Sequence, residues 1–273
     1  MSLMSQSISL YNQLAKHKLF NKTINFDLKR IKLALAKLDH PEEKLSNVIQ
    51  IIGSDGKYSV LRTLRFFIEE NNQTVSTHVS PSLKDIRERF WMGKNYLAHG
   101  EIRKTIKIIE KLKIPLTIYE VLTLIFIINA SQRKNDYCIQ EAGALWRLDS
   151  NNVINFPLKQ IVVNINKQHL NFLKKKTLDE VIYQKVGFLN QFTDIYIGKQ
   201  KPYVLKKIKK LLKKNYSQIK YSSSWKLIKT KKNYYYQDKK MRIKLNTKYI
   251  HSKGLLENIC LAIKISLDLK IDK

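Results

Sequence analysis

The sequence predicts an α/β fold of three layers, in which helices cover both faces of a mainly parallel β-sheet. Short β-branched runs, typical of buried strands, alternate along the chain with longer segments whose apolar residues recur at helical spacing. The apolar content of 44% is sufficient for a core of this kind. With 273 residues, the chain has room for one large α/β domain or two small ones.

The first predicted elements surround a glycine-containing turn. Residues 27–38 carry apolar side chains at helical spacing, and Pro41 ends this helix because proline cannot continue it. Residues 47–52 include the run VIQII, which is typical of a buried strand. Residues 53–56 form a tight turn, and residues 59–70 form the next helix. The unit is therefore strand, glycine turn and helix.

The later elements continue the alternation. Strands are predicted over 74–79, 136–140, 160–164 and 195–197, and helices over 104–111, 119–130, 178–186 and 257–269. Such an order favours a mainly parallel sheet, whose ligands bind at the carboxyl ends of the strands.

The chain is strongly basic, with 51 Lys and Arg against 22 Asp and Glu, a net charge of +29. Residues 1–198 contribute +11 and residues 199–273 contribute +18. Only 9 of the basic residues are Arg, the usual reader of guanine and phosphate, which argues against nucleic acid as a partner. Lys, Ile and Asn are abundant together, which is typical of an A/T-rich coding bias that fills ordinary surface positions with Lys.

Two segments of the Lys-rich end leave alternatives open. Lys206 to Lys214 predicts an amphipathic helix with Ile208, Leu211 and Leu212 on its apolar side, packed on a core or lying on an anionic surface. The segment 231–240, KKNYYYQDKK, predicts a turn or hairpin. Its tyrosines could stack on bases, or its lysines could protect the edge of a sheet.

The compartment is predicted from what the sequence lacks. Cys138 and Cys260 are too few for a disulfide framework or a four-thiolate zinc site, and they indicate a reducing, cytoplasmic setting. No secretory signal is visible at the N-terminus. The most apolar run, residues 116–130, contains Glu120 and is too short to cross a bilayer, so no membrane span is expected.

The turn GSDGKYS has the character of a phosphate-binding loop. Its glycines Gly53 and Gly56 let backbone N–H groups approach a phosphate, Lys57 can reach the terminal phosphates, and the Ser59 hydroxyl can bind Mg²⁺. The spacing GxxGKxS is shorter than the common GxxxxGK[ST]. Alone, it is equally consistent with an ordinary turn.

The turn resembles GTNGKGS of the folylpolyglutamate synthase/dihydrofolate synthase family, relatives of the Mur ligases. Other segments agree with motifs of this family in order and spacing from about Phe26 to Asn258. They are Ser80 to Leu83 with Glu88 and Arg89 (SPHL…ER), Tyr119 to Thr123 (FExxT), Glu141 to Gly143 with Arg147 to Ile154 (EVGLGGRLDATNVI), His169 to Thr177 (DHxxxLGxT), Lys185 to Gly187 (EKAGI) and Glu257 with Asn258 (ENA).

The resemblance implies a domain organisation. Residues 1–273 would form one ATPase-type domain like the P-loop central domain of Mur ligases. It would consist of a helical lead-in (1–46), a P-loop core (47–198) and a Lys-rich end (199–273). The smaller C-terminal domain of the family, which closes over the nucleotide, is expected to be absent. The chain is expected to be a monomer unless a second polypeptide supplies that domain.

The resemblance also implies a reaction. ATP and Mg²⁺ would convert a carboxylate of dihydropteroate or a reduced folate into an acyl phosphate, which the amine of L-glutamate attacks to form an amide. The implied catalytic residues are Lys57, His169 and a carbamylated Lys185. The nucleotide would be bound by Gly53, Ser54, Asp55, Gly56, Lys57, Ser59 and Asn258, with Asn258 at the adenine. The metal would be bound by Ser59, Ser80, Glu141 and His169. The pterin would be bound by Ser82, Leu83 and Arg89.

The sequence departs from the family pattern within the implied site. Ser54 and Asp55 replace Thr and Asn, Tyr58 replaces Gly, Leu145 and Trp146 replace two Gly, Gln168 replaces Asp, Lys174 replaces Gly, Gln184 replaces Glu, and Ser82 and Gly254 replace His. An acid at position 55 is unfavourable near phosphates unless it is neutralised. We therefore expect an impaired ligase. The alternatives are a catalytically dead homologue that keeps the fold, and a Lys-rich protein that binds nucleic acid or an anionic surface.

Overall fold

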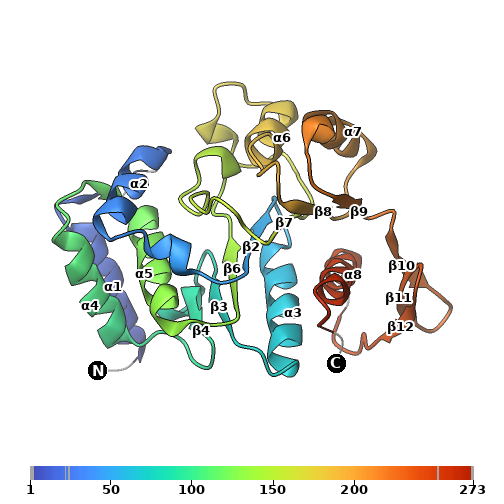
Figure 1. Ribbon diagram of the computed structural model, residues 1–273, viewed down its shortest axis with the longest axis horizontal. Coiled ribbons are helices and arrows are strands. Elements are labelled where there is room, and N and C mark those ends of the chain that lie inside the picture. Colours follow the sequence, from blue (N-terminus) through green and yellow to red (C-terminus); the bar gives the residue numbers. More distant parts are fainter. Residues whose placement is uncertain (1–2, 22, 24, 251, 272–273) are drawn as a thin grey trace. The chain divides into compact units, whose positions relative to one another are not determined.

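The computed structural model describes residues 3–21, 23, 25–250 and 252–271, and the chain divides into two compact units (Figure 1). The first unit comprises Met1–Val48, Gln73–Gly143 and Leu148–Asn155. The second unit comprises Ile49–Asn72, Ala144–Arg147 and Phe156–Lys273. That the whole chain acts as one ATPase-type domain stays a prediction.

The first unit contains a group of three paired strands. β3 (Val75–His78) is parallel to β6 (Tyr137–Glu141) and antiparallel to β4 (Phe90–Met92). Two shorter strands, β1 (Phe20–Asn21) and β5 (Leu116–Thr117), form a separate parallel pair. The longer helices of this unit are α1 (Leu3–Lys16), α2 (Leu28–Lys37), α4 (His99–Glu110) and α5 (Ile118–Arg133).

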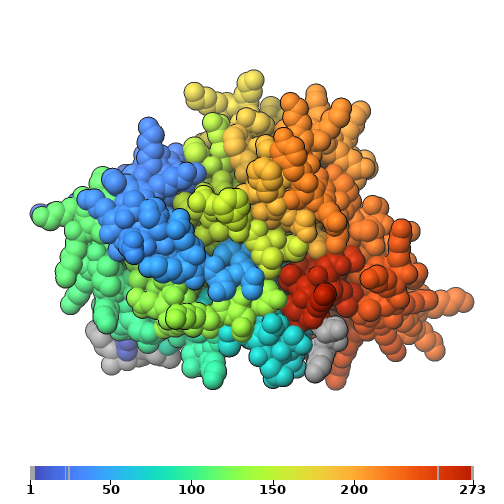
Figure 2. All heavy atoms as spheres, in the orientation of Figure 1, coloured from blue at the N-terminus to red at the C-terminus, as the bar shows by residue number. Residues whose placement is uncertain are grey.

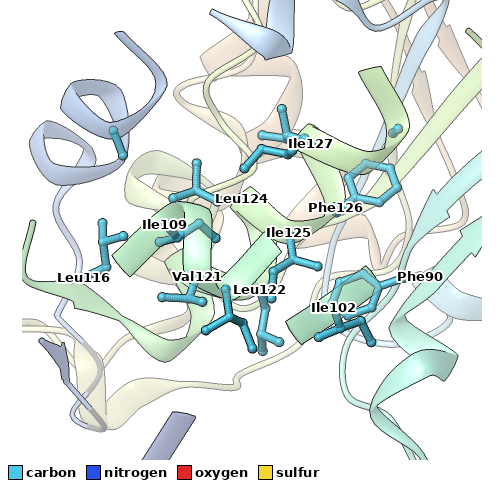
Figure 3. Packing of buried hydrophobic residues seen from close by; sticks show 14 of the residues in the cluster. Phe90, Ile102, Ile109, Leu116, Val121, Leu122, Leu124, Ile125, Phe126 and Ile127 are labelled. Carbon is cyan, nitrogen blue, oxygen red and sulfur yellow. The ribbon is translucent and has the colours of Figure 1, made fainter. Parts of the chain in front are cut away.

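Helix α5 forms the centre of the first unit's core. Its residues 120–130 are all buried and most of them are apolar, as expected for a core helix (Figure 3). Burying one side chain such as Leu124 contributes about 1.5–3 kcal/mol. The helix begins in a capping box, in which the Thr117 side chain accepts from the Glu120 backbone N–H and the Glu120 carboxylate accepts from the Thr117 N–H.

The second unit contains a parallel sheet. Its strand order is β2 (Val48–Ile52), β7 (Lys159–Val162), β8 (Asp194–Ile197) and β9 (Ile219–Tyr221), and every neighbouring pair is parallel. All five residues of β2 are buried, which explains its continuous apolar run. A buried amide pair interrupts the apolar interior, because Gln160 Nε2 donates to Gln50 Oε1 at 2.9 Å.

Two pairs of helices cover this parallel sheet. α3 (Lys57–Glu70) packs against α8 (Lys253–Asp268), and α6 (Leu178–Val186) packs against α7 (Pro202–Leu211). Within the second unit, the α3–α8 pair lies on one side of β7 and β8 and the α6–α7 pair lies on the other (Figure 1). Short 3₁₀ helices span Pro41–Lys44, Ile86–Arg89, Trp146–Leu148, Leu170–Phe172 and Leu212–Lys214.

The Lys-rich end adds a three-stranded antiparallel sheet to the second unit. It consists of β10 (Trp225–Lys229), β11 (Tyr234–Asp238) and β12 (Arg242–Leu245), with β11 in the middle. Trp225, Tyr236 and Leu245 are buried, and β10 packs on α8. The segment that contains these strands forms part of the molecular surface, in orange to red (Figure 2).

The predicted mainly parallel α/β fold is confirmed. Several parts of the fold were not predicted, among them helix α1, which buries Leu10 and Leu14, strands β4 and β9, and the full extent of the antiparallel sheet. One expectation is wrong in detail, because Leu211 stays 37% exposed at the end of α7 while Ile208 and Leu212 are buried. None of the helices in the described part of the chain is long and apolar enough to span a membrane.

Candidate nucleotide and substrate site

The predicted phosphate-binding turn lies between β2 and α3 in the second unit. Gly53 has φ of +143° and Gly56 has φ of +87°, and L-amino acids with side chains rarely adopt such values. Lys57 is the first residue of α3, and Ser59 lies within its first turn. The first turn of a helix carries backbone N–H groups without intrahelical acceptors and the positive end of the helix dipole. The turn therefore has the backbone geometry that suits a phosphate.

Two lysine side chains converge on the carbonyl of Gly53. Lys57 Nζ donates to Gly53 O at 3.4 Å and to Ser54 O at 3.0 Å. Lys185 Nζ, from α6, donates to Gly53 O at 2.8 Å and to Ala144 O. Lys185 is 1% exposed and Lys57 is 9% exposed. Two buried positive charges thus hold the turn, and they make its surroundings favourable for an anion.

His169 lies in the field of the same two lysines. Burial lowers the pKa of this half-buried imidazole, and the charges of Lys185 and then Lys57 lower it further. The ring is therefore neutral near pH 7, the state in which an imidazole can bind a metal ion. His169 has a φ of +58° and precedes the short helix Leu170–Phe172.

Asn258 from α8 lies directly against the turn. A Cβ atom added to Gly56 would lie 2.1 Å from Asn258 Nδ2, so the Asn258 amide would have to move, whereas the φ of Gly56 by itself favours glycine. Beside the turn, a pocket of about 420 Å³ opens near the start of α8. Its walls are Asn164, Ile165, Asn166, Lys199, Gln200, Lys201, Pro202, Lys253, Gly254 and Glu257. Three of these residues are lysines, so the pocket favours an anionic ligand.

The first unit holds the predicted acidic metal residue. Glu141 is the last residue of β6 and is 4% exposed, and its Oε2 accepts from the Ser80 backbone N–H at 3.1 Å. Asn151 Nδ2 donates to the Glu141 backbone carbonyl at 3.0 Å and to the Tyr119 hydroxyl at 3.0 Å. Asp149 accepts from the Gly143 N–H at 2.8 Å. Motif segments that are distant in sequence therefore meet around Glu141.

The predicted pterin loop is connected to helix α1. Arg89 Nε donates to the Tyr11 hydroxyl at 3.2 Å, and the same hydroxyl forms a short hydrogen bond with Ser82 Oγ. Leu83, in contrast, is 91% exposed. No sequence signal identified Tyr11, because it lies 71 residues before Ser82 and belongs to no motif.

Comparisons with known proteins identify proteins that are similar to the chain. No model of a protein family matches the chain. The dihydrofolate synthase/folylpolyglutamate synthase of Bacillus subtilis is 27% identical over 191 residues, which are 67% of this chain and 44% of that protein. The protein of the same name from Haemophilus influenzae is 27% identical over 226 residues, which are 81% of this chain and 50% of that protein. The chain is thus similar, over most of its length, to proteins named dihydrofolate synthase/folylpolyglutamate synthase. It spans about half the length of these curated relatives.

Solved structures show the same fold. Escherichia coli FolC in complex with DHPP and ADP has a TM-score of 0.82 at 21% identity, and the match covers 97% of this chain and 62% of that one. A bifunctional folylpolyglutamate synthase/dihydrofolate synthase with Mn, AMPPNP and L-glutamate bound has a TM-score of 0.77 at 20% identity, covering 97% and 62%.

The residues that depart from the family pattern have different positions in the fold. Tyr58 is 52% exposed on the first turn of α3, so its ring extends away from the interior. Leu145 and Trp146, in the places of two family glycines, are 4% and 1% exposed and act as core residues. Asp55 is exposed and accepts hydrogen bonds from two neutral amide side chains.

The predicted site residues fall into two groups. The second unit contains Gly53, Ser54, Asp55, Gly56, Lys57, Ser59, His169, Lys185 and Asn258, and the first unit contains Ser80, Ser82, Leu83, Arg89 and Glu141. The predicted metal residues are divided between the units. A different group, His40, Glu42 and Glu43, has ligand atoms within 4.8 Å of one another, but it was not predicted and belongs to the turn after α2.

Proposed function

We propose that the chain binds ATP with Mg²⁺ and is the nucleotide-binding part of a ligase that joins L-glutamate to dihydropteroate or a reduced folate. One observation carries the proposal. A glycine turn before α3 has positive φ values, and two buried lysines bind its carbonyl groups. The names of the relatives support the reaction class, and the neighbours with ADP, or with Mn and AMPPNP, support the cofactors.

The residues of the second unit fit a nucleotide and a metal ion. The N–H groups of the first turn of α3 and the Lys57 ammonium would hold the phosphates, and Asn258 and the adjacent pocket would hold the rest of the nucleotide. The neutral ring of His169 and the hydroxyl of Ser59 would hold the metal. A divalent cation, when bound, offsets phosphate charge and makes phosphorus more electrophilic.

The chemistry explains why positive charge is needed. A carboxylate is a poor electrophile, and its conversion to an acyl phosphate brings two anions together before the amine of glutamate attacks. Lys57 and Lys185 lower the electrostatic cost of that approach. In the first unit, the buried Glu141 carboxylate accepts a hydrogen bond from the Ser80 backbone N–H, and its role as a metal ligand stays a prediction. The roles of Ser82, Leu83 and Arg89 at the pterin stay predictions.

Carbamylation of Lys185 remains a separate prediction. The two carbonyl acceptors around its Nζ suit a protonated amine. A carbamate would replace that positive charge by a negative one. Bicarbonate dependence of turnover tests this point directly. The cytoplasmic location and the monomeric state likewise stay predictions.

The first experiment measures nucleotide binding by thermal shift. Wild-type protein should be stabilised by Mg·ATP, by about 2.7 kcal/mol when the nucleotide is at 100 times its Kd. Lys57→Met should lose most of this stabilisation. Lys104→Met, which removes an exposed lysine from α4, should retain it. Equal shifts in the two variants would contradict the proposed role of the turn.

The second experiment separates a ligase from a dead homologue. ADP release is measured with dihydropteroate or a reduced folate, L-glutamate and Mg·ATP, with and without bicarbonate. Release that requires both the pterin substrate and glutamate supports the ligase. Binding of Mg·ATP without any such release identifies a homologue that keeps the nucleotide site alone.

A second candidate function rests on the outer face of the antiparallel sheet. Lys226, Arg242 and Lys244 are exposed there, and the Arg242 guanidinium lies 4.2 Å from the centre of the Tyr235 ring. Basic side chains with an aromatic ring on a sheet face suit single-stranded nucleic acid. The test is the binding of a labelled oligonucleotide, which should weaken steeply as salt rises and should be lost when the three basic residues become Gln. Binding that salt or these substitutions do not change would reject this candidate.

A further inference from the structure

The turn 53–56 is held by hydrogen bonds from the segment that follows β7. Ser54 N–H donates to the Asn164 carbonyl at 2.8 Å, and Asp55 N–H donates to Asn164 Oδ1 at 3.1 Å. The Asn166 N–H donates to Ser54 Oγ at 2.9 Å. These bonds join two segments more than 100 residues apart in sequence. They fix the backbone of the turn from one side.

The Asp55 carboxylate completes this connection. Asn166 Nδ2 donates to Asp55 Oδ2 at 2.7 Å, and Gln168 Nε2 donates to Asp55 Oδ1 at 2.8 Å. In the part of the chain that the structure describes, no Lys, Arg or His forms an ion pair with this carboxylate. Both donors are neutral amides, so the hydrogen bonds orient the carboxylate while its negative charge persists.

Gln168 also immediately precedes His169. A residue with a φ of +58° is strained, and its neighbours must hold it in place. The Gln168–Asp55 hydrogen bond connects this position to the phosphate-binding turn. A substitution of Asp55 or Gln168 should therefore affect the position of both the turn and the His169 imidazole.

The chemical identities of the two partners are reversed relative to the sequence motifs. The family motifs have an amide (GTNGKGS) where this chain has Asp55, and an acid (DH) where it has Gln168. Either change alone would put two amides or two acids in contact. Both together keep one carboxylate and one amide, and their hydrogen bond is present at 2.8 Å.

We propose that Asp55 and Gln168 are a compensating acid–amide exchange, a pair of positioning residues that keeps one negative charge at this contact and ties the turn to His169. The role of the pair in nucleotide binding rests on the proposed function, whereas its charge coupling does not. On this inference, these two departures from the family pattern preserve the site and are no sign of its decay.

The pair predicts an unequal response to substitution. Asp55→Asn should change the stability only slightly, because the Gln168 amide can rotate and accept a hydrogen bond from the new side chain. Gln168→Glu keeps the length of the side chain but puts two carboxylates in contact, so like charges repel. The double variant again has one acid and one amide, and every hydrogen bond of the contact can form. Gln191→Glu is the matched control, because it adds the same charge at an exposed position elsewhere in the second unit.

The experiment is a double-mutant cycle with two readouts, urea unfolding without ligand and the thermal shift with Mg·ATP. We expect Gln168→Glu to raise the unfolding equilibrium constant roughly five- to thirtyfold, the range that follows from a change of about 1–2 kcal/mol. Asp55→Asn and Gln191→Glu should each change it by less than about threefold, as surface substitutions do. The double variant should return to within about threefold of wild type. The loss caused by Gln168→Glu should also shrink in high salt.

The outcomes separate the pair from the proposed function. If the double variant is as unstable as Gln168→Glu, the exchange is overturned. If stability is rescued and Mg·ATP binding is weakened by Gln168→Glu and restored in the double variant, the inference is supported in full. If Mg·ATP binds equally to all variants, the positioning role is overturned. If wild-type protein does not bind Mg·ATP, the proposed function fails, and the urea cycle alone decides the charge coupling.

Discussion

Gly56 offers the sharpest test of the geometry of the turn. Replacing it by Ala puts a side chain at a φ of +87°, and a left-handed conformation costs about 1–2 kcal/mol for a residue with a Cβ. The new methyl group would also lie 2.1 Å from Asn258 Nδ2, far inside ordinary contact distance. Turning the half-buried Asn258 amide out of the way costs about 0.5–1.5 kcal/mol. The sum is a destabilisation of about 1.5–3.5 kcal/mol.

A second substitution separates the two contributions. Asn258→Ala removes the amide that the new methyl group would strike. The double variant Gly56→Ala/Asn258→Ala should therefore recover about 0.5–1.5 kcal/mol and keep only the backbone cost. Asn258→Ala alone should change stability by less than about 1 kcal/mol, because the side chain is only half-buried.

The assay is urea unfolding followed by tryptophan fluorescence. Gly100→Ala is the matched control, because Gly100 lies in α4 with nothing within 4 Å of an added Cβ. It should stabilise the protein by about 0.5–1 kcal/mol. Gly56→Ala with an unchanged urea midpoint, or a double variant that is no more stable than Gly56→Ala, would refute the contact between α8 and the turn.

Three further predictions concern titratable groups. Burial lowers the pKa of His78 from its ordinary 6.5 to about 3, so below pH 6.5 the unfolded chain binds a proton that the native state does not. The free energy of unfolding should therefore fall with decreasing pH, by up to about 1.4 kcal/mol per pH unit. His78→Gln should remove the contribution of this ring to the pH dependence of the urea midpoint, measured from pH 7.5 to 5. Lys185→Met should raise the pKa of His169, measured by NMR titration, because it deletes a positive charge that lowers it. Burial raises the pKa of the Cys260 thiol to about 12 and that of Cys138 further, so neither should react with a thiol reagent at pH 8 until the protein is unfolded.

Each of these predictions has a clear contrary result. An acid slope that is identical in His78→Gln and wild type would show that the buried ring does not control it. A pKa of His169 that stays the same or falls in Lys185→Met would contradict the electrostatic account of that site. Rapid modification of either thiol in the native protein would contradict its burial.

The sequence by itself determined the strand, turn and helix over residues 47–70. This was possible because the signals are local: a continuous apolar run for a buried strand, glycines for positive φ, and helical spacing in α3. It also identified Lys57, Lys185 and Asn258, through spacing that resembles a family pattern. The structure brings all three to the turn itself, Lys57 and Lys185 onto its carbonyl groups and Asn258 against Gly56.

Only the tertiary structure decided what the departures from that pattern do. From the sequence, Asp55 is an acid near the expected phosphates, whereas in the fold two amides from the segment after β7 bind it. Tyr11 forms hydrogen bonds with the predicted pterin loop only because α1 packs beside that loop. Such contacts depend on which distant segments the sheet and core bring together. Local propensity and periodicity do not encode that information, and packing does.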